Sequence, residues 1–398
     1  MNRRGDLDVI VVGAGIVGAA AALALARDGL AVAVIEARAP QPWRASDEVD
    51  LRVVALAADA VDLFADLGAW DTVVGSRASA YRRMCVWDAL APGELRFDSA
   101  ERGDAALGWI VENRLLQHVL WTALADPGDV DHVPRLVCPA ALAGVENAED
   151  GVTVTLADGA RLRARVLVAA DGADSPVRSL LGIVTDERDY DQRAVVAHVT
   201  TERDHESTAW QRFQASGPLA LLPLADGRCS IVWSLPSAEA ERVLALDDAA
   251  FRDELGCATD FRLGTITATT VRRAFPLRLR LARRYVGGRC VLMGDAAHVV
   301  HPLAGQGLNL GLRDVRCLRA QFASARRRGG DIGSVQVLRR YERERRSENT
   351  LAAHGLDLIE RVFTSDSMPL ALARGMGLAA ANRLTPLRHL LAAVAAGR

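Results

Sequence analysis

The stretch DVIVVGAGIVGAAAALALARDGLAVAVIEAR, residues 8–38, decides the fold. It begins with an apolar run typical of a buried strand, passes through a glycine-rich turn of the form GxGxxG, and continues as an alanine- and leucine-rich segment typical of a helix. We expect a strand over residues 8–12, a helix over 16–27 that stops at Gly29, and a second strand over 31–36. This order of elements begins a dinucleotide-binding α/β domain.

Each glycine of the turn has its own task. Gly13 permits the sharp turn, Gly15 lets the backbone approach a pyrophosphate, and Gly18 lets the helix pack close to the strand. The phosphates would lie at the helix N-terminus, where free N–H groups favour negative charge. Glu36 closes the second strand, where a carboxylate can accept hydrogen bonds from both hydroxyls of an adenosine ribose. An acid there disfavours a 2′-phosphate, so the pattern predicts FAD or NAD rather than NADP at this site.

A second segment that could contact a large cofactor is LVAADGADSPVRSLLG, residues 167–182. An apolar strand runs directly into Asp171 and Gly172, and the Ser-Pro pair that follows can open a short helix carrying Arg178. An ordinary strand, turn and helix with a surface arginine is the alternative interpretation. The DGxxSxxR spacing is more specific than that.

The third signal is GDAAHVVHPLAGQGLNLGLRD, residues 294–314. It follows an expected buried strand over 289–293, so Asp295 stands at the carboxyl end of that strand, where ligands meet open α/β sheets. Bare backbone at Gly305, Gln306 and Gly307 would lie beside a ring or a phosphate, at the start of a helix from about residue 308.

Two histidines of this segment, His298 and His301, have a spacing that metal ligands can have. No third histidine, cysteine or carboxylate supports such a site, so we expect no metal. The six cysteines lie far apart without a CxxC pair, which indicates reduced thiols in a cytoplasmic protein.

Charge excludes several functions. The formal net charge is -2, and all 48 basic residues are arginine, so Schiff-base chemistry and a P-loop lysine are excluded. A balanced charge also gives no electrostatic footprint for nucleic acid. The arginine-rich start followed by an apolar stretch is similar to a secretory signal, but Asp6 and Asp8 interrupt it, and no apolar run is long enough to span a membrane.

Together the three signals resemble the FAD-dependent aromatic hydroxylases, which are single-component flavin monooxygenases with a GxGxxG, a DG and a GD motif in this order. The resemblance covers nearly the whole chain and is strongest toward the ubiquinone-biosynthesis hydroxylases. The segments that resemble these hydroxylases in particular are DLRVVAL (50–56), VENRLLQHVL (111–120), RFQASGPLALLPL (212–224) and 294–314. Leu51 departs from the family, which usually has a proline or similar residue before its arginine.

The resemblance implies an α/β fold with three parts: a Rossmann-like FAD-binding domain of the aromatic-hydroxylase type, an antiparallel-sheet substrate domain and C-terminal helices. The FAD-binding domain would be discontinuous, over residues 1–73, 104–183 and 276–345. The substrate sheet would take 74–103 and 184–275, and a helical segment would take 346–398.

The resemblance also implies positions around the cofactor. Glu36 would bind the adenosine ribose, and Asp295 the ribityl or pyrophosphate region. The DG segment, with Asp171, Gly172 and Arg178, would serve both FAD and the passing nicotinamide. The remaining implied contacts are Arg52, Arg114 and Gln117 near the flavin and pyrophosphate, and Gly305, Gly307, Leu308 and Asn309 at the isoalloxazine edge. A second GxGxxG is lacking, in agreement with a family without a separate nicotinamide domain.

The activity implied is hydroxylation of an electron-rich ring of a polyprenyl phenol or benzoquinol, with NADH or NADPH as electron donor and O2 as the source of oxygen. The cofactor carries this chemistry and the protein positions the reactants. Backbone from Pro302 through Gly307, including Gln306, is expected near the flavin, and His298 or His301 is expected to assist the phenol proton. Another flavin-dependent aromatic hydroxylase, a lipid reductase of the same fold and a non-catalytic flavoprotein subunit remain alternatives.

Strand-rich stretches at 81–98, 194–200, 219–223, 230–235 and 265–275 predict the antiparallel sheet that forms the substrate pocket. The candidate pocket residues are Phe213, Leu221, Leu222, Pro223 and Trp233.

The C-terminal stretch 375–398 is apolar with arginines and without acids. It could lie on the inner-membrane surface, dock a partner in a homo-oligomer or biosynthetic complex, or pack on its own protein.

Overall fold

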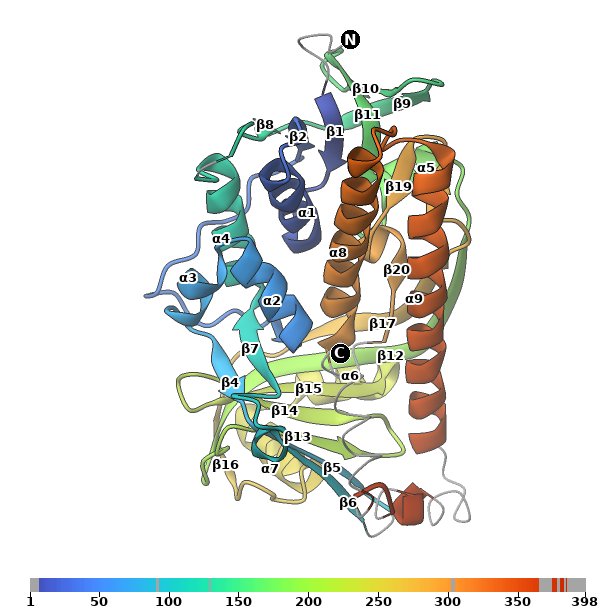
Figure 1. Ribbon diagram of the computed structural model, residues 1–398. Coiled ribbons are helices and arrows are strands. Elements are labelled where there is room, and N and C mark those ends of the chain that lie inside the picture. The colour runs from blue at the N-terminus through green and yellow to red at the C-terminus, as the bar shows by residue number, and fades with distance from the viewer. Residues whose placement is uncertain are drawn as a thin grey trace.

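The computed structural model describes residues 7–90, 93–128, 130–301, 305–364, 374–377, 380–382 and 384. The predicted catalytic Pro302 lies outside the described residues, as does most of the stretch 375–398. Figure 1 shows a mixed α/β molecule with two large sheets at opposite ends and two long helices along one side. The α/β fold class is confirmed.

The first sheet contains the predicted dinucleotide-binding unit. Its main path runs β18-β19-β11-β1-β2-β8, and β10 and β9 extend it from β11. The central strands β19, β11, β1, β2 and β8 are parallel, as in a Rossmann-type domain. The bounds are β1 Leu7–Val12, β2 Val32–Ile35, β8 Arg135–Val137, β9 Leu142–Asn147, β10 Val152–Leu156, β11 Arg161–Ala169, β18 Val286–Gly287 and β19 Cys290–Leu292.

Helix α1, Ile16–Arg27, has the predicted bounds and is buried on nearly all sides. It packs against α4, Asn113–Ala125, and α8, Gln306–Arg327. Its contact with α8 is close because a Cβ on Gly311 would lie only 2.7 Å from a methyl carbon of Val17. The glycine therefore fixes the start of α8 near the glycine-rich turn.

The second sheet has the path β20-β17-β12-β15-β14-β13-β5-β6, with β16 beside β12. All pairs are antiparallel except β13 with β5. The predicted boundary at residue 276 falls inside β17, which pairs with β12 along its length. The bounds are β5 Arg83–Asp88, β6 Glu94–Asp98, β12 Thr185–Thr201, β13 Thr208–Phe213, β14 Leu219–Pro223, β15 Cys229–Pro236, β16 Ile266–Thr269, β17 Arg273–Ala282 and β20 His298–Val299.

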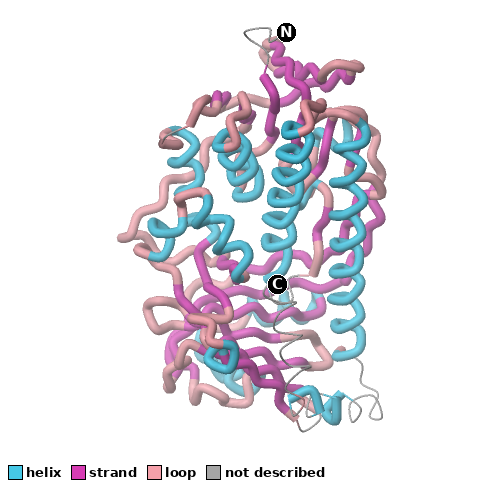
Figure 2. The backbone as a smooth tube through the Cα atoms, in the orientation of Figure 1, coloured by secondary structure: helices cyan, strands magenta, loops and turns pink. Residues whose placement is uncertain are grey.

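One face of this sheet packs against α6, Ser237–Ala245, and α7, Asp248–Ala258, in a separate apolar core. The other face turns toward the first sheet. Between the two lies a small antiparallel sheet of β3, β7 and β4, with bounds Val53–Leu56, Gly108–Glu112 and Ser79–Tyr81. In Figure 2 most helices gather beside the first sheet and most strands at the opposite end.

The remaining helices are α2 Ala58–Asp66, α3 Trp70–Val74, α5 Pro176–Leu180 and α9 Val335–Phe363, with 3-10 turns at Ser99–Arg102 and Gly294–Ala296. Helix α9 packs along α8 at the edge of the molecule (Figure 1). Among the described residues, no helix combines the length and the apolar character needed to cross a membrane.

Candidate functional site

The glycine-rich turn is packed closely on two sides and open on the third. A Cβ on Gly13, whose φ is +94°, would lie 2.3 Å from the carbonyl oxygen of Ala170, and one on Gly18 would lie 1.9 Å from that of Gly13. A Cβ on Gly15 would meet nothing within 4 Å. The first turn of α1 has no acidic residue and its N-cap has no side-chain hydrogen bond. Open space beside free N–H groups fits a pyrophosphate.

Glu36 lies at the end of β2, beside this turn. Its Oε2 accepts a hydrogen bond from the Ala14 N–H at 2.6 Å, and its Oε1 accepts one from the Arg38 N–H at 3.0 Å. The half-buried carboxylate is therefore fixed against the first residue after Gly13. This position agrees with the predicted ribose contact.

The DG segment follows β11 and lies beside the glycine-rich turn, since the Ala170 N–H donates to the Val12 carbonyl oxygen at 2.8 Å. Asp171 Oδ2 accepts a hydrogen bond from the Val177 N–H at 3.0 Å, whereas its buried Oδ1 has no partner among the described residues. Burial raises the pKa of Asp171, and hydrogen bonds from Ser175 and Val177 oppose that shift. Gly172 has a φ of +87° and open space where a Cβ would be. An orphaned carboxylate oxygen beside bare backbone fits a hydroxyl-bearing ligand.

Arg178 joins the DG and GD segments. Ser175 caps α5 and accepts a hydrogen bond from the Arg178 N–H at 2.9 Å. The guanidinium donates to the carbonyl oxygens of Ala296 at 2.9 Å and Ala173 at 2.7 Å. The alternative interpretation of Arg178 as a surface arginine is wrong, because the side chain is buried.

Asp295 lies on the 3-10 turn at the end of β19, and its side chain is exposed toward the cleft. Its carboxylate has no hydrogen-bond donor in the part of the chain that the structure describes. The surrounding protein desolvates it and raises its pKa, while the charges of His298 and Arg52 act in the opposite direction. A carboxylate in this setting is available to accept hydrogen bonds from a ligand.

Two acids that we did not predict position the arginines of the site. Asp50 accepts hydrogen bonds from the backbone N–H groups of Arg52 at 3.1 Å and Arg114 at 3.2 Å. The buried Glu112 in turn accepts one from the Asp50 N–H at 2.7 Å. Both acids lie inside segments that carry the family resemblance, 50–56 and 111–120. Their hydrogen bonds to each other and to Arg114 join residues more than 60 positions apart, and such contacts leave no local signal in a sequence. Gln117 lies half-buried on α4, without a described partner.

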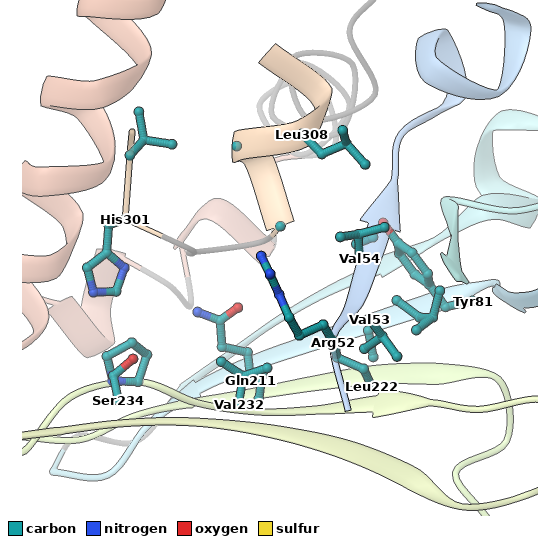
Figure 3. A pocket seen from close by; sticks show the side chains of 18 of the residues that line it. Arg52, Val53, Val54, Tyr81, Gln211, Leu222, Val232, Ser234, His301 and Leu308 are labelled. Atoms are coloured by element: carbon teal, nitrogen blue, oxygen red, sulfur yellow. The ribbon is translucent and has the colours of Figure 1, made fainter. Parts of the chain in front are cut away.

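Arg52 projects into a cavity of about 320 Å³ between the start of α8, β3 and the inner face of the second sheet. In Figure 3, His301 and Ser234 lie at one side, Tyr81, Val53 and Leu222 at the other, and Arg52 between them. Most of the lining is apolar. The lining residues are Arg52, Val53, Val54, Ala55, Tyr81, Met84, Ile110, Ala209, Trp210, Gln211, Pro218, Ala220, Leu222, Val232, Ser234, Asp295, Val299, Val300, His301, Gly305, Gly307 and Leu308.

Only Leu222 of the five predicted pocket residues lines this cavity. Leu221 and Trp233 pack into the core formed with α6 and α7, and Pro223 shares the face of β14 with Leu221. Phe213 stacks on Phe363 at 4.1 Å between ring centroids. For β14 the prediction failed because both faces of the strand are apolar, so alternation alone does not say which face meets the cavity.

His298 and two residues at the start of α8 also lie differently from the prediction. The buried His298 ring points to Asp314, at 2.7 Å, and is not part of the cavity lining, and its role in assisting the phenol proton stays a prediction. The Gln306 side chain is not part of the lining either. Asn309 is a clamp, because its Oδ1 accepts from the Ala57 N–H at 3.0 Å and its Nδ2 donates to the Ala55 carbonyl at 2.8 Å.

His301 does line the cavity. Burial lowers the pKa of His301 to about 4, so the ring is neutral at pH 7. Neither ring nitrogen has a hydrogen-bond partner among the described residues, and the ring packs edge-on against Tyr190, 5.3 Å between centroids. An unpaired, neutral imidazole in a cavity wall can exchange a hydrogen bond with a ligand.

A Rossmann-type sheet with glycine-containing turns, next to an apolar cavity over an antiparallel sheet, is the architecture of a dinucleotide-binding flavoprotein. Residues 6–353 match the family model described as FAD binding domain, and the chain belongs to this family. It is an FAD-dependent monooxygenase.

Curated relatives match nearly the whole chain. The 3-demethoxyubiquinol 3-hydroxylase of Escherichia coli is 37% identical, over 96% of this chain and 96% of its own. The ubiquinone hydroxylase UbiL of Rhodospirillum rubrum is 38% identical, over 96% of this chain and 88% of its own. Among solved structures, Pseudomonas aeruginosa PqsL in complex with 2-aminobenzoylacetate has a TM-score of 0.76 at 23% identity, over 94% of this chain and 99% of that one, which confirms the fold.

Proposed function

We propose that this monooxygenase hydroxylates the aromatic ring of a polyprenyl phenol or benzoquinol in ubiquinone biosynthesis, using NADH or NADPH and O2. The observation that carries the proposal is the cavity, which joins an apolar lining to a few polar groups beside Asp295 and the start of α8. Such a lining suits a ring with a hydrocarbon substituent. The names of the curated relatives support the same substrate class.

The cofactor would lie along the three glycine-containing segments. Glu36 would accept hydrogen bonds from the adenosine ribose, and Asp295 from the ribityl or pyrophosphate region. The remaining proposed contacts are Gly13, Gly15, Gly18, Arg52, Arg114, Gln117, Asp171, Gly172, Gly305, Gly307 and Leu308. When bound and reduced by NAD(P)H, FAD would activate O2, so that one oxygen atom would be transferred to the ring carbon and the other would leave as water.

The protein's own task is to orient the ring and exclude water. The apolar lining of β3, β13 and β14 would exclude water from the reacting atoms. The neutral His301 can accept a hydrogen bond from a ring hydroxyl and so orient its proton while the oxygen donates electron density to the ring. Asn309 and Arg178 would act as positioning residues, because they tie α8 to β3 and the GD segment to the DG segment.

The test is an assay of the purified protein with FAD, NAD(P)H and a short-chain prenylphenol. Oxygen uptake coupled to a product one oxygen heavier is the expected result. Flavin reduction without an oxygenated product would favour a lipid reductase. A lack of reduction would favour a non-catalytic flavoprotein subunit.

We also propose a cytoplasmic protein that works at the inner-membrane surface, where a polyprenyl substrate would reside. The assignment of this contact to the stretch 375–398, and any homo-oligomer or assembly with other biosynthetic proteins, stay predictions.

A further inference from the structure

The C-terminal half of α9 has an inverted distribution of polar and apolar side chains. Leu351 is 76% exposed and Leu358 62%, whereas Asp357 and Glu360 on the same helix are only 6% and 5% exposed. A surface helix normally turns its apolar residues to the core and its charges to water. The inversion indicates that something other than water covers the outer face of this helix.

The buried acids have partners inside the protein. Asp357 accepts from the Arg188 guanidinium at 2.8 Å, and Glu360 accepts from the Gln192 side chain at 3.2 Å, both on β12. These contacts fix the rotation of the helix. Leu351 and Leu358 therefore face outward because the opposite face is bound to the sheet.

The N-terminal half of α9 is strongly basic on its exposed side. Arg339, Arg340, Arg343 and Arg346 are exposed, and none of them forms an ion pair within the described ranges. Arg340, Leu351 and Leu358 follow one another at spacings of eleven and seven residues, which places them on one side of a helix. One side of the helix thus carries Arg340, with Arg343 next to it, at one end and the exposed leucines at the other. Arg339 and Arg346 lie toward its flank.

We infer that this outer band of α9, defined by Arg340, Arg343, Leu351 and Leu358, docks the protein on an anionic phospholipid surface. Headgroup phosphates supply the negative charge that the arginines lack, and the leucines insert between the acyl chains. Arginine stems add apolar contact while the guanidinium groups stay at headgroup level. Figure 1 shows α9 at the outer edge of the molecule, where a flat surface can reach it.

A second copy of the chain fits the band less well. In a two-fold contact the same patch meets itself, so arginines would meet a patch that offers them few acids. Of the exposed acids on this helix, Glu348 already pairs with Arg345, whereas Glu344 contacts the neutral Gln321 and keeps its charge. The unpaired arginines outnumber it. A membrane with anionic lipids has the complementary charge over the whole band.

The experiment is co-sedimentation of the purified FAD-loaded full chain with sucrose-loaded vesicles. One set contains phosphatidylcholine with about a third phosphatidylglycerol, and the other phosphatidylcholine alone. The variants are Arg340→Gln/Arg343→Gln and Leu351→Gln/Leu358→Gln. Two matched controls lie outside α9. Arg135→Gln/Arg203→Gln removes two exposed arginines, and Val271→Gln removes an exposed apolar side chain between β16 and β17.

Binding to the anionic vesicles is expected, with partitioning lowered about tenfold or more by each α9 variant and unchanged by the controls. The neutral vesicles should bind weakly. No vesicle binding, or equal binding by wild type and α9 variants, would overturn the inference. A dimer that dissociates in Leu351→Gln/Leu358→Gln without vesicle binding would also overturn it, in favour of self-association. The assay needs no turnover, so its result is independent of the proposed hydroxylation.

Discussion

Asp314 and His298 form a buried hydrogen bond, 2.7 Å between Oδ2 and Nε2, directly beneath the GD segment. The same Oδ2 accepts from the Gly294 N–H at 2.9 Å, one residue before Asp295. The other oxygen, Oδ1, accepts from Arg345 at 2.7 Å and Asn349 at 3.1 Å, both on α9. One carboxylate therefore holds the cofactor segment, α8 and α9 together.

The substitution Asp314→Asn should loosen this junction. Burial alone would raise the pKa of Asp314, but His298 and Arg345 hold it below its usual range, so the carboxylate is charged. An amide removes the buried one of the two carboxylates that pair with the Arg345 guanidinium, which should cost about 3 kcal/mol of unfolding free energy and lower FAD retention. Urea denaturation and the flavin-to-protein absorbance ratio measure both effects. If Asp314→Asn had the stability and flavin content of the wild type, Asp314 would not hold these segments together.

The substitution Asp295→Ala should abolish FAD retention while the fold persists, since this carboxylate is exposed to the cleft and has no described protein partner. The variant should purify colourless with an unchanged circular dichroism spectrum. Asp253→Ala, an exposed acid on α7, is the control and should purify yellow. A fully yellow Asp295→Ala would refute the assignment.

The substitution Glu36→Ala should weaken FAD binding by about 1 to 3 kcal/mol, because charge-assisted hydrogen bonds to the ribose are lost. Titration of the apoprotein with FAD, followed by tryptophan fluorescence, measures the change. Glu36→Gln keeps a hydrogen-bond acceptor and should lose less affinity than Glu36→Ala. Unchanged affinity in Glu36→Ala would exclude the side chain from the site.

His301 should make stability depend on pH. Its pKa is lowered from 6.5 to about 4, so between these values the unfolded chain binds a proton that the folded chain does not. This contribution to unfolding free energy therefore rises with pH, by about 1.5 kcal/mol between pH 5 and 6.5. His301→Gln should remove that slope in urea denaturation at the two pH values. The same change in unfolding free energy between pH 5 and 6.5 in wild type and His301→Gln would contradict a buried neutral imidazole.

Neighbouring positions of β14 should respond in opposite ways. Ala220→Phe adds volume inside the cavity and should lower kcat/KM for a prenylphenol by more than tenfold, with FAD binding little changed. Leu221→Ala leaves the lining intact but opens a hole in the core against α6 and α7, which should cost about 2 to 5 kcal/mol of stability. Steady-state kinetics and denaturation together test the assignment of faces. Equal activity of Ala220→Phe and wild type would show that substrate does not reach this part of the cavity.

The local parts of the fold were predictable because their signals are local. Periodicity and glycine placement predicted β1, α1 and β2 nearly residue by residue. They also predicted Asp295 at the end of β19 and Ser175 as the cap of α5. Each of these features depends on residues within one or two turns of the chain.

The contacts between distant segments were not predictable in this way. The sequence allows Arg178 to be a cofactor contact or a surface residue, and neither interpretation includes the hydrogen bond that its guanidinium donates to the carbonyl oxygen of Ala296. In the sequence, His298 is a candidate catalytic histidine. In the structure, its ring shares a hydrogen bond with Asp314 and does not line the cavity. Such outcomes depend on how separate elements pack, which a single sequence does not state.

The order of strands in the first sheet has a consequence for synthesis. Strand β1 begins at residue 7, but its neighbour β11 ends at residue 169, and β19 with the GD segment follows only from residue 290. Asp314, which holds that segment, is later still. A growing chain thus completes the cleft only after about four-fifths of its length has left the ribosome, so cofactor loading waits for the last segments and the early strands need protection until then.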